Sequence, residues 1–93
     1  MDKYLRAYAE VDLAAIGHNI AGVRKNVGRD VKICAVIKAD AYGHGAVAVG
    51  RYLENAVEYF AVATVDEAIE LREAGSRLPI IILSYVSPSR YDE

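Results

Sequence analysis

The sequence VKICAVI at residues 31–37 is apolar at six of its seven positions and rich in β-branched side chains. Such a run is typical of a strand that is covered on both faces in a parallel sheet. Two further apolar runs, YFAVA at residues 59–63 and PIIIL at residues 79–83, are centred about 27 and then about 20 residues further on. The sequence therefore predicts three parallel strands with room for a helix between each pair.

The first predicted helix lies ahead of residues 31–37. Asp12 can accept hydrogen bonds from the first turn as an N-cap, and Gly28 can end the helix. Between them, apolar residues spaced three and four apart fall on one helical face: Leu13, Ile16, Ile20, Val23 and Val27. Residues 4–11, which alternate in character and contain β-formers, predict an additional strand before this helix.

Three more helical segments are predicted after residue 37. One follows the Gly43 and Gly45 turn and runs to about residue 55 or 56. Another begins at a capping box, in which Thr64 and Glu67 each accept from the other's backbone N–H, and ends near Gly75. The last would open at residues 87–88, where a proline suits a first turn.

Repeated strand and helix units of this kind form either an open doubly wound sheet or an eight-stranded barrel. Because a barrel needs about 250 residues, a chain of 93 residues with three such strands cannot close one. In the barrel alternative, the chain is an amino-terminal fragment whose edges other strands would cover. We then expect the isolated chain to be aggregated or molten.

Composition narrows the class of partner. The net charge of −2 offers no positive field for nucleic acid, and no apolar stretch reaches the 18 or so residues of a membrane span. The single cysteine, Cys34, cannot form an intrachain disulfide and is expected to be a buried, reduced thiol. Cys34, His18 and His44 have no metal-ligand spacing. These features predict a cytoplasmic protein without a metal site, a nucleic-acid partner or a membrane segment.

Lys38 is the residue that points to chemistry, because it follows directly after residues 31–37. In parallel α/β proteins, side chains at the carboxyl ends of strands converge on a shared site. An uncharged lysine amine there can attack an aldehyde, although a lone lysine at a strand end is more often a solvated terminus. By the period of two along a strand, Val36 and Cys34 share the face of Lys38.

The eleven residues AVIKADAYGHG, 35–45, resemble the pyridoxal phosphate attachment motif of the alanine racemases. The resemblance extends to AEVDL at residues 9–13, to His18-Asn19, to the segment from residues 61–63 through 66–72, and to residues 79–83. It therefore spans almost the whole chain. Ser84 departs from the family, since many members have glycine there.

The resemblance implies that residues 1–93 are the amino-terminal part of a (β/α)8 barrel domain, in a homodimeric enzyme with a separate β-rich domain. Lys38 would bind pyridoxal 5'-phosphate and exchange a proton with the substrate, on the face that handles the D-enantiomer. Tyr42 would contact the cofactor phosphate. A tyrosine of the other subunit would act on the opposite face, so the isolated fragment is expected to be inactive.

Two more residues are candidates for lining the cofactor site, Val36 beside Lys38 and Leu83 at the end of the third strand. His44 is expected to have a hydrogen-bonded supporting role rather than a catalytic one. The implied reaction is interconversion of L-alanine and D-alanine for peptidoglycan synthesis. A serine or broad-specificity amino-acid racemase, and a non-catalytic pyridoxal phosphate-binding barrel protein, remain alternatives.

Overall fold

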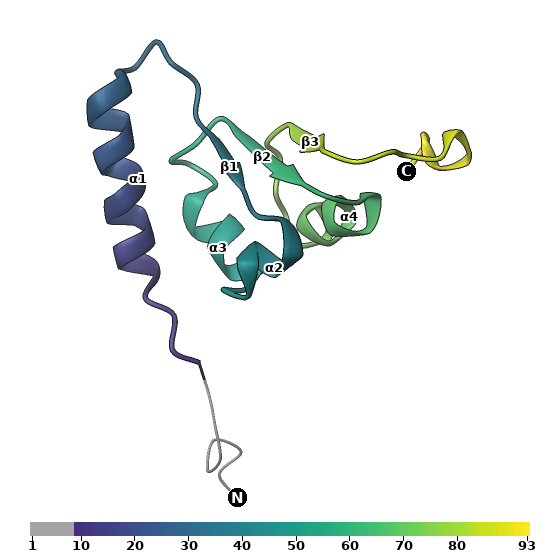
Figure 1. Cartoon of the computed structure of the whole chain (residues 1–93), viewed down its shortest axis with the longest axis horizontal. Coiled ribbons are helices and arrows are strands. Elements are labelled where there is room, and N and C mark those ends of the chain that lie inside the picture. Colours follow the sequence, from purple (N-terminus) through teal and green to yellow (C-terminus); the bar gives the residue numbers. More distant parts are fainter. Residues whose placement is uncertain (1–8) are drawn as a thin grey trace, which may run out of the picture.

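The structure, a computed structural model, describes residues 9–93, and the predicted strand at residues 4–11 lies largely outside them. The elements follow in the order α1 (Leu13–Val27), β1 (Cys34–Val36), α2 (Lys38–Tyr42), α3 (Ala46–Leu53), β2 (Tyr59–Val62), α4 (Val65–Glu73), β3 (Ile80–Ile82) and the 3-10 turn η1 (Pro88–Arg90). Figure 1 shows this order along the chain, with α1 standing to one side of the sheet. The predicted alternation of strands and helices is confirmed.

The three strands form one parallel sheet in the order β1-β2-β3. Val36 pairs with Ala61, which pairs in turn with Ile81, so the strands lie in a simple sequential register. Each strand is shorter than its apolar run. Directly after β1, for example, Ile37 has φ −124° and ψ 30°, so the chain leaves the extended conformation before Lys38.

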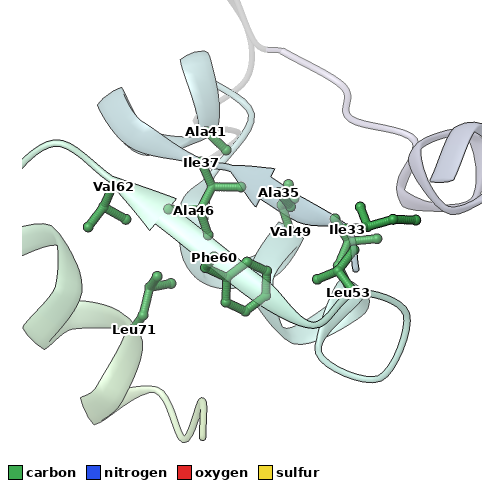
Figure 2. Close-up of a cluster of buried hydrophobic side chains, with 11 residues drawn as sticks. Ile33, Ala35, Ile37, Ala41, Ala46, Val49, Leu53, Phe60, Val62 and Leu71 are labelled. Atoms are coloured by element: carbon green, nitrogen blue, oxygen red, sulfur yellow. The ribbon is translucent and has the colours of Figure 1, made fainter. Parts of the chain in front are cut away.

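The core lies between one face of this sheet and the helices α3 and α4. Phe60 and Val62 are fully buried there, and Leu71 of α4 is 2% exposed (Figure 2). Ile33, Ala35 and Ile37 point to the same side and are also buried. Burial thus alternates along the chain around β1, as the period of two requires.

The two helix starts for which the sequence predicts a side-chain cap are confirmed. The Asp12 side chain accepts from the N–H of Ala15 at 3.1 Å. At the start of α4, Thr64 accepts from the N–H of Glu67 at 3.2 Å, and Glu67 accepts from the N–H of Thr64 at 3.2 Å. These bonds satisfy N–H groups that a helix cannot pair internally.

An ion pair joins α1 to the amino ends of β1 and β2. The Arg24 guanidinium contacts both carboxylate oxygens of Glu58, at 2.8 and 2.7 Å, and also donates to the carbonyl of Val31 at 2.7 Å. Glu58 in turn accepts from the N–H of Ile33 at 2.7 Å. The hydrogen bond from Arg24 is the main cause that lowers the pKa of Glu58.

Within residues 9–93, no helix is long and apolar enough to cross a membrane.

Candidate active site at the carboxyl edge of the sheet

Lys38 lies where β1 ends and is half-buried. The N–H of Ile37 still donates to the carbonyl of Ala61 at 2.9 Å, as a strand residue would. The carbonyl of Ile37 instead accepts from the N–H of Ala41 at 3.0 Å, within the chain that follows. The sheet ladder to β2 therefore stops at Lys38. The period of two does not extend to Lys38, because Ile37 is no longer extended.

The residues after Lys38 form a left-handed turn. Ala39, Asp40, Ala41 and Tyr42 have φ between 51° and 57°, and ψ is between 43° and 48° for the first three. Each L-residue in this conformation costs about 1–2 kcal/mol, and several in succession are unusual. The turn ends at Gly43, with φ 90°, where the absence of a Cβ removes that cost. The sequence signals for a turn did not predict its left-handed sense.

Hydrogen bonds hold this turn in place. The N–H of Gly45 donates to the carbonyl of Asp40 at 2.8 Å, and the Asp40 carboxylate accepts from the N–H of Ala46 at 2.8 Å. Asp40 thereby joins the turn to the first residue of α3. The His44 ring pairs through Nδ1 with the carbonyl of Ala41 at 3.1 Å. The hydrogen bonding predicted for His44 is therefore present, and its partner is the turn itself.

The structure places the predicted site residues along one edge of the sheet. Lys38 directly precedes the left-handed residues, and Tyr42, which is 59% exposed, is the last of them before Gly43. Leu83, 54% exposed, follows β3, and its N–H donates to the carbonyl of Val62 at 2.8 Å. Val36, Ala61 and Ile81 are in register across the three strands, and Lys38 and Leu83 each lie two residues beyond their member of this set, so both follow the carboxyl end of a strand.

Val36 lies two residues before Lys38 on the sheet face opposite the core, and it is 42% exposed. It also lines a cavity of about 390 Å³ at the β1 edge, together with Ile16 and Ile20 of α1. Cys34 shares the exposed face of the strand. The expectation that Cys34 is buried is wrong for the described residues, because helices cover only the other face of β1. Partial burial nevertheless raises the pKa of the Cys34 thiol.

Two residues near this edge have contacts that sequence reasoning missed. The Glu67 carboxylate accepts from the N–H of Ala39 at 2.7 Å and from the N–H of Ala63 at 2.7 Å, beyond its predicted capping role. The hydroxyl of Ser84 donates to the carbonyl of Ala63. A capping-box pattern signals only the local bonds of Glu67, whereas Ala39 is 28 residues away.

In residues 9–93, no group of three or more histidine, cysteine or acidic side chains could hold a metal ion.

Three parallel strands with helices on one face, and a lysine at the carboxyl edge, define this chain as a segment of an α/β barrel. A family model described as "Alanine racemase, N-terminal domain" matches residues 11–93. The chain therefore belongs to the alanine racemase family.

Curated relatives and solved structures agree with this assignment. Alanine racemase 1 of Caldanaerobacter subterraneus subsp. tengcongensis is 55% identical over 82 residues, which cover 87% of this chain and 21% of the relative. The structure of alanine racemase from Clostridium difficile 630 matches with a TM-score of 0.87 and 45% identity, over 91% of this chain and 24% of that one. The chain thus spans about a fifth of the length of the curated relatives it matches.

A further solved structure bears on ligands. The alanine racemase of Bacillus anthracis, described with bound L-Ala-P, matches with a TM-score of 0.79 and 42% identity. The match covers 84% of this chain and 20% of that one.

Proposed function

We propose that the protein containing this segment is an alanine racemase, an isomerase of class EC 5.1.1.1 that interconverts L-alanine and D-alanine. Residues 1–93 would be the amino-terminal part of its barrel domain. The observation that supports this most strongly is the position of Lys38, at the carboxyl end of β1 and at the start of a left-handed turn that carries Tyr42. Family membership supplies the reaction type.

The side chains on this turn suit pyridoxal 5'-phosphate. The cofactor presents an aldehyde and a phosphate, and the turn offers a lysine amine and, four residues later, an exposed tyrosine hydroxyl. Lys38 would bind the aldehyde carbon and Tyr42 would contact the phosphate. When bound, the cofactor supplies an electron sink that makes the substrate Cα–H acidic. Val36 and Leu83 would line the same site from β1 and from the end of β3.

Lys38 would move the proton on one face of the substrate. Its Nζ, as a free amine, takes a proton from Cα, and as an ammonium it returns one to the same face. Inversion of Cα needs a second proton-transferring group on the opposite face, which Lys38 cannot reach. His44 already pairs with the carbonyl of Ala41. We therefore place the second group on another subunit of a homodimer, as the family resemblance implies, with Lys38 serving the D-enantiomer.

The proposed substrate is a small amino acid, and the proposed role is the supply of D-alanine for peptidoglycan in the cytoplasm. L-Ala-P in the Bacillus anthracis relative supports a ligand of this size. The one cysteine in the chain, Cys34, is compatible with a reducing compartment.

The test uses the full-length protein that contains this sequence, supplied with pyridoxal phosphate. We expect D-alanine to form from L-alanine, and Lys38→Ala to abolish it. Borohydride reduction should fix the cofactor to the peptide that contains Lys38. Lys32→Ala is the matched control, because Lys32 precedes β1 and Lys38 follows it; the Lys32 Nζ lies 5.7 Å from the ring centre of Tyr59, and the variant should keep activity.

Label recovered on Lys32 or Lys25 would contradict the assignment of Lys38. Faster turnover of L-serine than of L-alanine would favour the serine or broad-specificity racemase. Cofactor attachment without turnover of any amino acid would favour the non-catalytic pyridoxal phosphate-binding protein. Robust turnover by the isolated 93-residue chain would contradict the need for a second subunit.

A further inference from the structure

We propose that Glu67 is a positioning residue for Lys38, holding the peptide group that directly follows the lysine. This inference rests on the proposed function, in which Lys38 binds the cofactor. One Glu67 oxygen accepts from the N–H of Ala39 at 2.7 Å, and the other accepts from the N–H of Ala63 at 2.7 Å. A single carboxylate on α4 thus joins the chain after β1 to the chain after β2.

Glu67 replaces the sheet ladder at the point where the ladder stops. The last ladder contact of β1 is the bond from the N–H of Ile37 to the carbonyl of Ala61. One step further on, the carbonyl of Ile37 accepts from Ala41 within the left-handed turn, and the N–H of Ala63 turns to Glu67 instead. Without the carboxylate, the N–H groups of Ala39 and Ala63 would both lose their acceptor.

The hydrogen bond from Ala39 to Glu67 orients the backbone from which the Lys38 side chain extends. The N–H of Ala39 belongs to the peptide unit that begins at the Lys38 carbonyl, so fixing that N–H fixes the plane of the unit. Ala39 is also the first residue in the left-handed conformation, which an unsupported chain would tend to leave. Hydrogen bonds to an ionised carboxylate are stronger than neutral ones. The direction in which Lys38 leaves the backbone therefore depends on Glu67.

This role differs from the capping of α4. Capping requires only that one Glu67 oxygen accept from the N–H of Thr64, and that Thr64 accept from the N–H of Glu67. The oxygen that reaches Ala39 has no part in the capping box. The two roles can be separated, since Thr64→Ala weakens the cap and leaves the bonds from Ala39 and Ala63 intact.

The experiment compares variants of the full-length holoenzyme. In Glu67→Gln, one of the two oxygens becomes an NH2 group, which cannot accept a hydrogen bond. The remaining oxygen should stay with the N–H groups of Ala63 and Thr64, which share one oxygen in the parent, so the N–H of Ala39 loses its acceptor. We expect kcat to fall by about 10- to 100-fold with a small change in KM, because misplacement of a reacting group by about 1 Å can cost 100-fold. Thr64→Ala should keep kcat within about 3-fold of the parent. Glu70→Gln, on the exposed face of α4, is the charge-matched control and should leave kcat unchanged.

Two readouts are independent of turnover. Amide hydrogen exchange at Ala39 should become at least about 10-fold faster in Glu67→Gln and stay unchanged in Thr64→Ala. Attachment of pyridoxal phosphate to the apoprotein, followed by visible absorbance, should also be slower in Glu67→Gln. If Glu67→Gln does not fold, Glu67→Asp gives the same comparison, because its carboxylate is one methylene too short to reach Ala39 and Ala63 together.

The proposal would be overturned if the Glu67 variant and Thr64→Ala had the same kcat and the same rate of amide hydrogen exchange at Ala39. Glu67 would then act only as a cap of α4. The proposed function fails by a different result, a parent protein that neither attaches the cofactor through Lys38 nor forms D-alanine. In that event faster exchange at Ala39 in Glu67→Gln would still establish the link to the Lys38 peptide, but unchanged exchange would reject it.

Discussion

Replacing Ala39 with glycine should stabilise the protein, although glycine usually weakens a helical turn. Ala39 has φ 51° and ψ 48°, and the residue is exposed to solvent. Removing the methyl therefore relieves the left-handed conformation and sacrifices little buried surface. The matched control is Ala48→Gly, at an exposed position inside the right-handed helix α3.

Two opposing contributions set the expected change in the free energy of unfolding of Ala39→Gly. Relief of one left-handed L-residue is worth about 1–2 kcal/mol. The greater freedom of glycine in the unfolded chain costs about 0.4–1 kcal/mol. Ala39→Gly should therefore raise the free energy of unfolding by about 1 kcal/mol. Ala48→Gly should lower it by about 1 kcal/mol, which separates the two variants by about 2 kcal/mol.

Urea denaturation of the full-length protein, followed by circular dichroism at one fixed protein concentration, measures both changes. The slope with urea should be the same in the parent and both variants, so that the shift in midpoint reports stability. If Ala39→Gly destabilises as much as Ala48→Gly, Ala39 is not held at positive φ in solution. That result would contradict a left-handed turn after Lys38.

Three further predictions concern the core, the ion pair and the thiol. Phe60→Ala should lower the free energy of unfolding by about 3–5 kcal/mol, because Phe60 is fully buried, and a loss below about 1 kcal/mol in urea denaturation would contradict its place in the core. The hydrogen bond from Arg24 is the main cause that lowers the pKa of Glu58, so ionised Glu58 stabilises the folded protein above its unfolded-state pKa, and this stabilisation is lost as pH falls through its folded-state pKa. The free energy of unfolding of the parent should therefore exceed that of Glu58→Gln by less and less below about pH 4.5. A difference that grows as the pH falls would contradict the lowered pKa. Burial raises the pKa of the Cys34 thiol, so its pH profile of alkylation should lie above that of the same protein unfolded in urea, and coincident profiles would disprove the shift.

The amino-acid sequence was sufficient to predict the three strands, the capped helix starts and the place of Lys38 after the first strand. These features depend on local patterns: apolar runs, helical spacing, and caps such as Asp12 and Thr64, whose partners lie within three residues. The resemblance carried by residues 35–45 pointed to the family that the comparisons then established. The assignments of Lys38, Tyr42, Val36 and Leu83 to a cofactor site remain predictions.

Tertiary structure decided what depends on residues far apart in the chain. Cys34 lies within an apolar run that looks buried, yet helices cover only the opposite face of β1, so this thiol is exposed in the described residues. The left-handed turn after Lys38 breaks the usual preference of L-residues, and its supports include the Glu67 carboxylate from α4. Residue type decides only the local conformational preference of the chain. The hydrogen bond from Ala39 to Glu67 joins residues that are 28 positions apart, so it forms only once β1, β2 and α4 have packed together. Packing therefore supplies the acceptor that holds the strained turn in place.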